Sequence, residues 1–219
     1  MYKDVDKLWQ LHSGCEHVCQ YCYAKGGLKS VLDIKELRDT NLNLKRPVKI
    51  FVDYKSDLFA HSVPELEIKI VLLKCSKSPQ NTYIFQSKNP NRALEFKNLF
   101  PPLFLMGTTI ETNRQDYLDS LSKAPPVIDR ANAIKEFAPN NFVTIEPILD
   151  FDLPQMMELI ISAKPSKIYV GADSKFRVQK ELKKKLFEPS KENIESLLQA
   201  LKLEGFEVIK KFNLERLQK

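Results

Sequence analysis

Apolar residues along this chain gather in short runs that alternate with longer stretches of mixed polarity. Short runs rich in β-branched and aromatic residues are typical of buried strands. Such runs occur at residues 7–11, 48–52, 82–86, 104–110, 141–145, 167–170 and 206–209. Each of them predicts a β-strand.

Helical patterns fill several of the intervals between these runs. Residues 64–75 repeat apolar side chains at helical spacing among charged ones. Residues 154–163 begin with a proline and residues 190–203 with a serine, both of which are favoured at the start of a helix. Strands that alternate with helices favour a parallel sheet with right-handed crossovers.

The length of the chain limits how far such a sheet can close. A complete eight-unit barrel usually needs about 250 residues, whereas this chain has 219. The sequence therefore predicts an α/β fold, a partial (β/α)6-type open TIM-like barrel. We expect residues 1–175 to form the barrel core and residues 176–219 to form a basic helix and strand segment packed on it.

Polar residues cluster where the predicted strands end. In a parallel sheet of this kind the carboxyl ends of the strands meet at one edge, where ligands bind. The residues in question are Asp53, Ser56, Asp57, Gln86, Ser87, Lys88, Thr109, Glu111, Asn113, Glu146, Asp173, Ser174 and Lys175. Loops begin with polar residues in most proteins, but Glu111 and Glu146 stand inside apolar runs. A carboxylate there is costly unless it is paired or lines a polar cavity.

Charge and hydropathy add little to this picture. The net charge is +6, and residues 175–219 supply +5 of it, with 12 Lys and Arg against 7 Asp and Glu. This tail could attract phosphates, although a solvated helix surface has the same composition. The first residues show no signal-peptide pattern and no apolar stretch is long enough for a membrane span, so we expect a cytoplasmic protein.

Three of the four cysteines stand close together, as Cys15, Cys19 and Cys22 in the spacing C-x3-C-x2-C. Thiolates at such spacing hold zinc or an iron–sulfur cluster. A structural zinc site needs four ligands, and His12 or His17 could supply the fourth. A [4Fe-4S] cluster held by three thiolates instead keeps one iron open for another ligand.

The cysteine loop, with Tyr21 just before its last cysteine, resembles the signature of the radical S-adenosylmethionine superfamily. The further segments "SDLFAHSVP", "FQSKNPNR", "GTTIETNR", "VTIEPIL" and "VGADSK" follow in the order of a phage-associated family known mainly as a domain of unknown function. A shorter likeness links the loop to spore photoproduct lyase, a DNA-repair member of the superfamily. The resemblance covers roughly residues 9–175.

This resemblance implies a mechanism. The open iron would chelate S-adenosylmethionine, and one electron from the reduced cluster would cleave it to methionine and a 5′-deoxyadenosyl radical that takes hydrogen from a substrate. Cys15, Cys19 and Cys22 would be the cluster ligands. The residues implied at the cofactor are Tyr21, Asp53, Ser56, Asp57, Lys88, Thr109, Glu111, Glu146, Gly171 and Asp173.

Some positions depart from the motifs of the resembled families. Ser87 and Asn89 replace a threonine and an arginine around Lys88, and Asp173 replaces a glutamate. The Gly-Gly-Glu segment that holds the cofactor amine elsewhere in the superfamily is absent. The lone Cys75 resembles a buried structural cysteine, with a role as hydrogen-atom donor as the alternative suggested by spore photoproduct lyase.

The expected partners follow from the same resemblance. The substrate is unidentified, and the phage-associated relatives and the basic tail favour a nucleotide or a nucleic-acid base. A reducing electron donor such as flavodoxin or ferredoxin is expected, and no membrane. The alternative is a non-catalytic metal protein, either a zinc-stabilised nucleic-acid binder or an iron–sulfur electron carrier.

Overall fold

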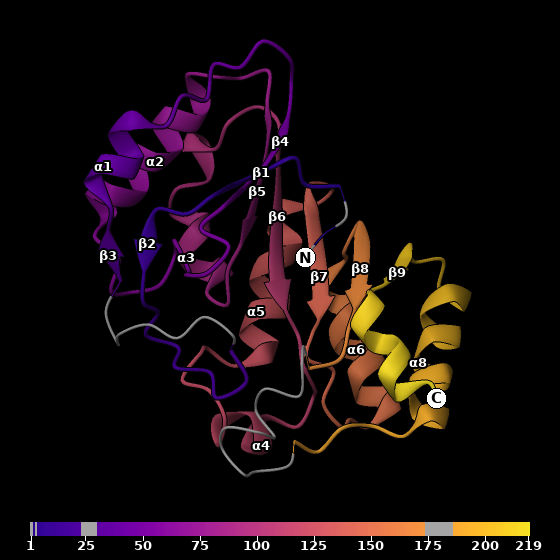
Figure 1. The fold of residues 1–219 in the computed structure, drawn as a ribbon. Coiled ribbons are helices and arrows are strands. Elements are labelled where there is room, and N and C mark those ends of the chain that lie inside the picture. The colour runs from indigo at the N-terminus through magenta and orange to yellow at the C-terminus, as the bar shows by residue number, and fades with distance from the viewer. Residues whose placement is uncertain (1, 3, 23–29, 174–185) are drawn as a thin grey trace.

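A computed structural model describes residues 2, 4–22, 30–173 and 186–219 of the chain. Its main feature is a parallel sheet of seven strands in the order β1-β4-β5-β6-β7-β8-β9. The strands are β1 (Lys7–Trp9), β4 (Lys49–Val52), β5 (Thr82–Gln86), β6 (Phe104–Thr109), β7 (Asn141–Ile145), β8 (Lys167–Val170) and β9 (Val208–Lys210). They lie side by side in Figure 1. Each matches one of the predicted runs to within two residues at either end.

The sheet is open, because β1 and β9 are its two edges within the described residues. The seven strands are neighbours in the sheet in the same order in which they occur along the chain. This order is that of a (β/α) barrel, here left open. The predicted fold class is therefore confirmed, with β9 as a seventh strand beside β8. The division into a core and a C-terminal segment stays a prediction, and its boundary at residue 175 lies outside the described residues.

Helices connect the strands and cover the outer face of the sheet (Figure 1). They are α1 (Ile34–Asp39), α2 (Glu65–Ser76), α3 (Pro90–Leu94), α4 (Gln115–Asp119), α5 (Val127–Ile134), α6 (Leu153–Ala163) and α8 (Lys191–Leu203). Short 3-10 helices occupy η1 (Lys97–Leu99), η2 (Lys135–Phe137) and η4 (Phe212–Leu217), and β2 (His12–Ser13) pairs with β3 (Val31–Leu32) in a hairpin. None of the described helices is long and apolar enough to cross a membrane.

Local sequence explains where the predicted helices begin. The hydroxyl of Ser190 accepts a hydrogen bond from the backbone N–H of Asn193, which caps α8. Pro154 lies in the first turn of α6, where its missing N–H costs nothing. The predicted helix over residues 64–75 is present as α2.

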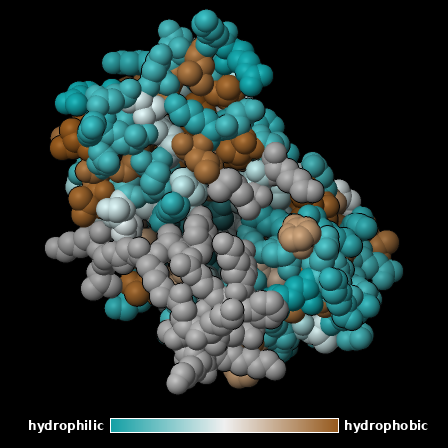
Figure 2. Space-filling view, in the orientation of Figure 1, coloured by the Kyte–Doolittle hydropathy of each residue, from teal (hydrophilic) through white to brown (hydrophobic). Residues whose placement is uncertain are grey.

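Apolar residues lie on both sides of α2. Ile68 and Leu72 are buried, whereas Leu66 and Leu73 are 67% and 50% exposed. Ile34 of α1 is exposed as well. Figure 2 shows apolar areas at the end of the molecule where α1 and α2 lie. The helix therefore has no clean polar face, and its periodicity could not reveal which side is buried.

Two apolar clusters lie on the two faces of the sheet. The larger one packs the helices against the outer face. The smaller one fills the inner face with Phe51, Ile84, Phe142 and Tyr169, and Tyr2 packs among them from before β1. Tyr2 reaches ring centroid distances of 4.4 Å to Tyr169 and 5.5 Å to Phe142. Tyr2 thus packs on the inner face of the open sheet.

Candidate active site

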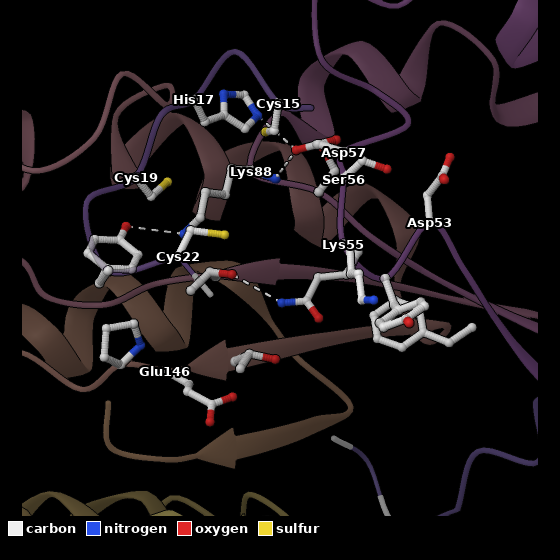
Figure 3. A pocket seen from close by; sticks show the side chains of 18 of the residues that line it. Cys15, His17, Cys19, Cys22, Asp53, Lys55, Ser56, Asp57, Lys88 and Glu146 are labelled. Atoms are coloured by element: carbon white, nitrogen blue, oxygen red, sulfur yellow. Dashed lines mark hydrogen bonds and ion pairs between the residues drawn. The ribbon is translucent and has the colours of Figure 1, made fainter. Parts of the chain in front are cut away.

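A cavity of about 430 Å³ lies at the carboxyl ends of the parallel strands, directly beneath the cysteine loop. This is the size of an ordinary small-molecule site. Its lining contains most of the residues predicted from the sequence (Figure 3). These are Cys15, Cys19, Tyr21, Cys22, Asp53, Ser56, Asp57, Lys88, Thr109, Glu146 and Asp173.

The cysteine loop is held over this cavity by side chains that stand between its cysteines. Both carboxylate oxygens of Glu16 accept backbone N–H bonds, from His61 and Ser62, in the loop after β4. The backbone of Gln20 donates to the carbonyl of Leu121, at 2.8 Å. The loop is therefore fixed to two other loops by residues that are not themselves ligands, which preorganises the three thiols.

Asp57 provides a third attachment of the loop. One of its oxygens lies 2.8 Å from Nε2 of His17 and also accepts the backbone N–H of Lys88 at 2.8 Å. Burial alone would raise the pKa of Asp57, but hydrogen bonding and charge from His17, with help from Ser87 and Lys88, lower it. Asp57 thus joins the cysteine loop to the ends of β4 and β5.

The three thiols line the cavity without gathering on a single point. Within the described ranges, no three His, Cys, Asp or Glu side chains converge closely enough to hold one metal ion. A mononuclear zinc site requires such convergence, whereas each thiolate of a [4Fe-4S] cluster binds a different iron. The histidines considered as zinc ligands are also engaged: Asp57 holds His17, and two carboxylates hold His12.

Burial keeps the Cys15 thiol protonated until a metal binds. Burial, followed by the charge of Asp57, raises the pKa of Cys15 to about 12. Cys19 Sγ lies 3.0 Å from the Ser122 hydroxyl, in the loop that precedes α5. Metal coordination removes the thiol proton outright. The donor set therefore fits an iron–sulfur cluster held by Cys15, Cys19 and Cys22.

Glu111 is not on the cavity wall; it lies buried beneath the loop, between two cations. Its Oε2 is 2.9 Å from Nη1 of Arg130, and its Oε1 accepts bonds from Lys88 and, at 2.5 Å, from the Tyr21 hydroxyl. Burial would raise its pKa, but the charges of Lys88 and Arg130 and these hydrogen bonds lower it to about 2. Glu111 is therefore charged and fixes Tyr21, the neighbour of Cys22.

Asp53 lines the cavity, but its carboxylate is hydrogen-bonded to residues at the start of β2. Its Oδ1 accepts the backbone N–H groups of Leu11 and His12 at 2.8 Å, and its Oδ2 lies 2.6 Å from Nδ1 of His12. The other ring nitrogen of His12 lies 3.1 Å from Glu67. Burial would lower the pKa of His12, yet the two carboxylates outweigh it and raise the pKa. Asp53 positions this turn.

Glu146 stands on the opposite wall and faces two residues from the end of the chain. Lys211 forms an ion pair with its Oε2, and Asn213 donates to its Oε1 at 2.6 Å. Gly171 is not on the wall. A Cβ at Gly171 would lie 2.9 Å from Glu146 Oε1 and 2.7 Å from Asn213 Oδ1, so glycine makes room for this contact.

The floor of the cavity is made of neutral hydrogen-bonding groups above the aromatic cluster. The Tyr2 hydroxyl donates to Gln86 Oε1 at 2.6 Å and lies 2.7 Å from the Thr144 hydroxyl. Gln86 in turn donates to Thr109 at 3.1 Å. The floor is thus polar, and the groups that form these hydrogen bonds are uncharged.

Cys75 lies away from the cavity, fully buried in α2. Burial raises the pKa of its thiol. This placement favours the packing role over that of a hydrogen-atom donor.

Asn113 also lies off the cavity, bonded to Asp152, and Ser174 and Lys175 lie outside the described residues.

Several residues of the site were not predicted. Arg130 sits in α5, a helix with no strong start signal, and its charge gave no hint of burial. Tyr2 and Lys211 lie near the two ends of the sequence, and only the curvature of the sheet brings Lys211 Nζ to 4.4 Å from the ring centroid of Tyr2. His17, considered from the sequence as a fourth zinc ligand, instead anchors the cysteine loop through Asp57.

Comparison with solved structures gives the same fold. Spore photoproduct lyase complexed with dinucleoside spore photoproduct superposes with a TM-score of 0.66 at 13% identity, over 93% of this chain and 76% of that one. A mutant of that lyase with bound AdoMet and dinucleoside spore photoproduct gives 0.66, also at 13%, over 92% and 75%. SuiB of Streptococcus suis bound to S-adenosylmethionine gives 0.59 at 11%, over 94% of this chain and 50% of that one.

At such low identity these matches show the fold alone. A search among curated proteins finds no significant match. One family profile does match, over residues 3–162, and it is described as a protein of unknown function, DUF5131. This match spans most of the chain and includes the cysteine loop and the ends of β4, β5, β6 and β7. The chain belongs to the DUF5131 family.

Proposed function

We propose that this protein is a radical S-adenosylmethionine enzyme. The observation that carries the proposal is the placement of Cys15, Cys19 and Cys22, which line the same cavity as polar residues at the ends of six parallel strands. In an open barrel with a three-cysteine loop over the carboxyl ends of its strands, the site for a cluster and the site for its cofactor lie next to each other. The fold shared with spore photoproduct lyase and SuiB supports it.

The residues divide into ligands, cofactor contacts and supports. Cys15, Cys19 and Cys22 would hold a [4Fe-4S] cluster with one open iron. Around S-adenosylmethionine we place the cavity-lining side chains Tyr21, Ser56, Lys88, Thr109, Glu146 and Asp173. Asp53, Asp57, Glu111 and Gly171 support these residues from behind. When bound, the cluster and S-adenosylmethionine supply the one-electron cleavage that starts hydrogen abstraction.

The protein's own contribution is positioning and exclusion of water. The loop is fixed through Glu16, His17 and Tyr21, which holds the three cysteines that would bind the cluster over the cavity. Tyr2 lines the cavity and packs in the apolar cluster of the inner face. Apolar side chains beneath the cavity exclude water, which protects a radical from solvent.

The substrate that fits best is a nucleotide or a nucleic-acid base. Two lines support it: some solved structures of spore photoproduct lyase hold dinucleoside spore photoproduct, and the last 45 residues carry most of the net positive charge. SuiB, in contrast, is solved with a precursor peptide, so a peptide is the competing class. The electron would come from a reducing protein such as flavodoxin or ferredoxin.

The test is reductive cleavage of the cofactor. The protein is purified without oxygen, its iron and sulfide are reconstituted, and 5′-deoxyadenosine is measured by mass spectrometry after dithionite and S-adenosylmethionine are added. We expect 5′-deoxyadenosine from the wild type and none from Cys19→Ala. Zinc as the only bound metal would overturn the proposal and favour a zinc-stabilised nucleic-acid binder.

A further inference from the structure

The cations that line the cavity differ in how their charge is balanced. Lys88 is paired with Glu111, and Lys211 with Glu146. Lys55, which also lines the cavity, has no carboxylate within ion-pair distance among the residues that the structure describes. Figure 3 places Lys55 across the cavity from Cys19 and close to Ser56. Its ammonium group is therefore a positive charge available to a ligand.

The turn that carries Lys55 is held rigid from below. Asp53 adopts a left-handed backbone conformation with φ +53°, and its backbone N–H donates to the carbonyl of Trp9 at 2.8 Å. A non-glycine residue in this region costs free energy and is kept where the surroundings enforce it. The Gln10 side chain accepts the backbone N–H of Lys55 at 2.8 Å and donates to Ser56 Oγ at 3.0 Å.

An aromatic ring accompanies the charge. Tyr54 also lines the cavity, and Lys55 Nζ lies 5.1 Å from the centroid of its ring. Tyr54 packs against Phe51, at 6.4 Å between centroids, so its position is fixed by the aromatic cluster of the inner face. A fixed ring beside an unbalanced ammonium can contact a planar base and the phosphate attached to it.

We propose that Tyr54 and Lys55 form the substrate subsite of the cavity, in which Lys55 binds the phosphate group of a nucleotide and Tyr54 contacts its base. The phosphate belongs either to a free nucleotide or to a nucleic-acid strand. This inference rests on the proposed function, since it names the part of that site which takes the substrate. It leaves the cluster side of the cavity to the cofactor.

The test is equilibrium binding, which does not depend on cofactor cleavage. The reconstituted protein is titrated with the four deoxynucleoside 5′-monophosphates, with the matching nucleosides, with inorganic phosphate and with a single-stranded oligothymidylate. The variants are Lys55→Gln and the conservative Lys55→Arg. Lys69→Gln, on the exposed side of α2 and paired with Glu65, is the matched control.

We expect Lys55→Gln to weaken binding of at least one nucleotide about tenfold and to leave the corresponding nucleoside unchanged. Lys55→Arg and Lys69→Gln should bind like the wild type. If the oligothymidylate is the ligand, its affinity should also depend less on salt in Lys55→Gln. The slope of log affinity against log salt concentration should decrease in magnitude by about one. If the oligothymidylate binds more tightly than the mononucleotide, the phosphate belongs to a nucleic-acid strand.

Three results would overturn the inference: no measurable nucleotide binding, equal weakening of nucleotide and nucleoside, or inorganic phosphate bound as tightly as the nucleotide. A loss of S-adenosylmethionine affinity in Lys55→Gln with nucleotide affinity unchanged would assign Lys55 to the cofactor instead. The proposed function fails by a separate result, the absence of 5′-deoxyadenosine from wild-type protein that contains its cluster.

Discussion

Glu111 and Glu146 follow neighbouring strands in almost the same sequence context, yet the fold gives them different environments. Glu111, after β6, is fully buried between Lys88 and Arg130. Glu146, after β7, lines the cavity, and its side chain is 20% exposed and paired with Lys211. Both satisfy the rule that a carboxylate in an apolar run must be paired or line a polar cavity. One carboxylate supports the site, and the other can meet a ligand.

The physical difference lies in how many charges surround each carboxylate. A buried ion pair is costly to break, because removing one partner leaves an uncompensated charge without water. Glu111 balances two cations at once, and it holds Tyr21 and therefore the last cysteine of the loop in place. Glu146 meets one cation and one amide at a wall that water reaches. Substitutions should therefore separate a folding effect at Glu111 from a ligand effect at Glu146.

The largest effect is expected from Glu111→Gln. It leaves the side chains of Arg130 and Lys88 without their counter-ion, and we expect the free energy of unfolding to fall by about 3–5 kcal/mol in urea titrations. Glu65→Gln, in an exposed ion pair on α2, should show no resolvable change. A loss at Glu111 no larger than that of the control would contradict the buried role.

A double variant keeps this prediction testable if Glu111→Gln does not fold. Glu111→Gln combined with Arg130→Met removes both charges of the fully buried pair and leaves a methionine that fills much of the same space. Replacing a buried pair by apolar groups is often neutral. The double variant should therefore be more stable than Glu111→Gln alone, and additivity of the two single losses would count against direct coupling.

A smaller effect is expected from pH. The folded pKa of Glu111 is about 2, below the ordinary value of 4.5, so its contribution to stability is complete above pH 4.5 and is lost as the pH falls from 4.5 toward 2. Asp57, whose pKa is also lowered, acts in the same direction. Urea midpoints of the wild type should drop over this range, and those of Glu111→Gln should drop less. Parallel profiles would show that Glu111 is not the titrating group.

The smallest effect on folding is expected from Glu146→Gln. An amide can still accept from Asn213, and water reaches Lys211, so we expect a loss of about 1 kcal/mol or less in the free energy of unfolding. If Glu146 contacts S-adenosylmethionine as proposed, the rate of 5′-deoxyadenosine formation should fall roughly tenfold, the value of one hydrogen bond to a charged group. A fully active variant would show that Glu146 forms part of the cavity wall without contacting S-adenosylmethionine.

The contrast between these two glutamates also shows how far the sequence could lead. The strands were predictable because each is a compact apolar run, and their order follows from the alternation with helices. Convergence of Ser56, Lys88, Thr109 and Glu146 on one cavity was predictable, because the carboxyl ends of parallel strands meet. The sequence contained no signal that separates Glu111 from Glu146, since both stand in "TIE" after an apolar run.

Contacts made by the curvature of the sheet could not be predicted. Arg130 comes from a short helix in which it resembles a solvated charge, and its burial depends on the exact approach of α5 to β6. Lys211 and Tyr2 are more than two hundred residues apart in sequence and touch only because the open sheet bends. Likewise, α2 has apolar residues on both its buried and its exposed side, so periodicity alone could not indicate which side packs on the sheet.

The central claim is that the three-cysteine loop leaves one iron open to S-adenosylmethionine. Electron paramagnetic resonance tests it most directly, on anaerobically reconstituted and reduced protein before and after S-adenosylmethionine is added. The account predicts the signal of a reduced [4Fe-4S] cluster in the wild type, a change of that signal when S-adenosylmethionine binds, and no such cluster in Cys22→Ala. A cluster signal that S-adenosylmethionine leaves unchanged, or a protein that binds only zinc, would contradict it.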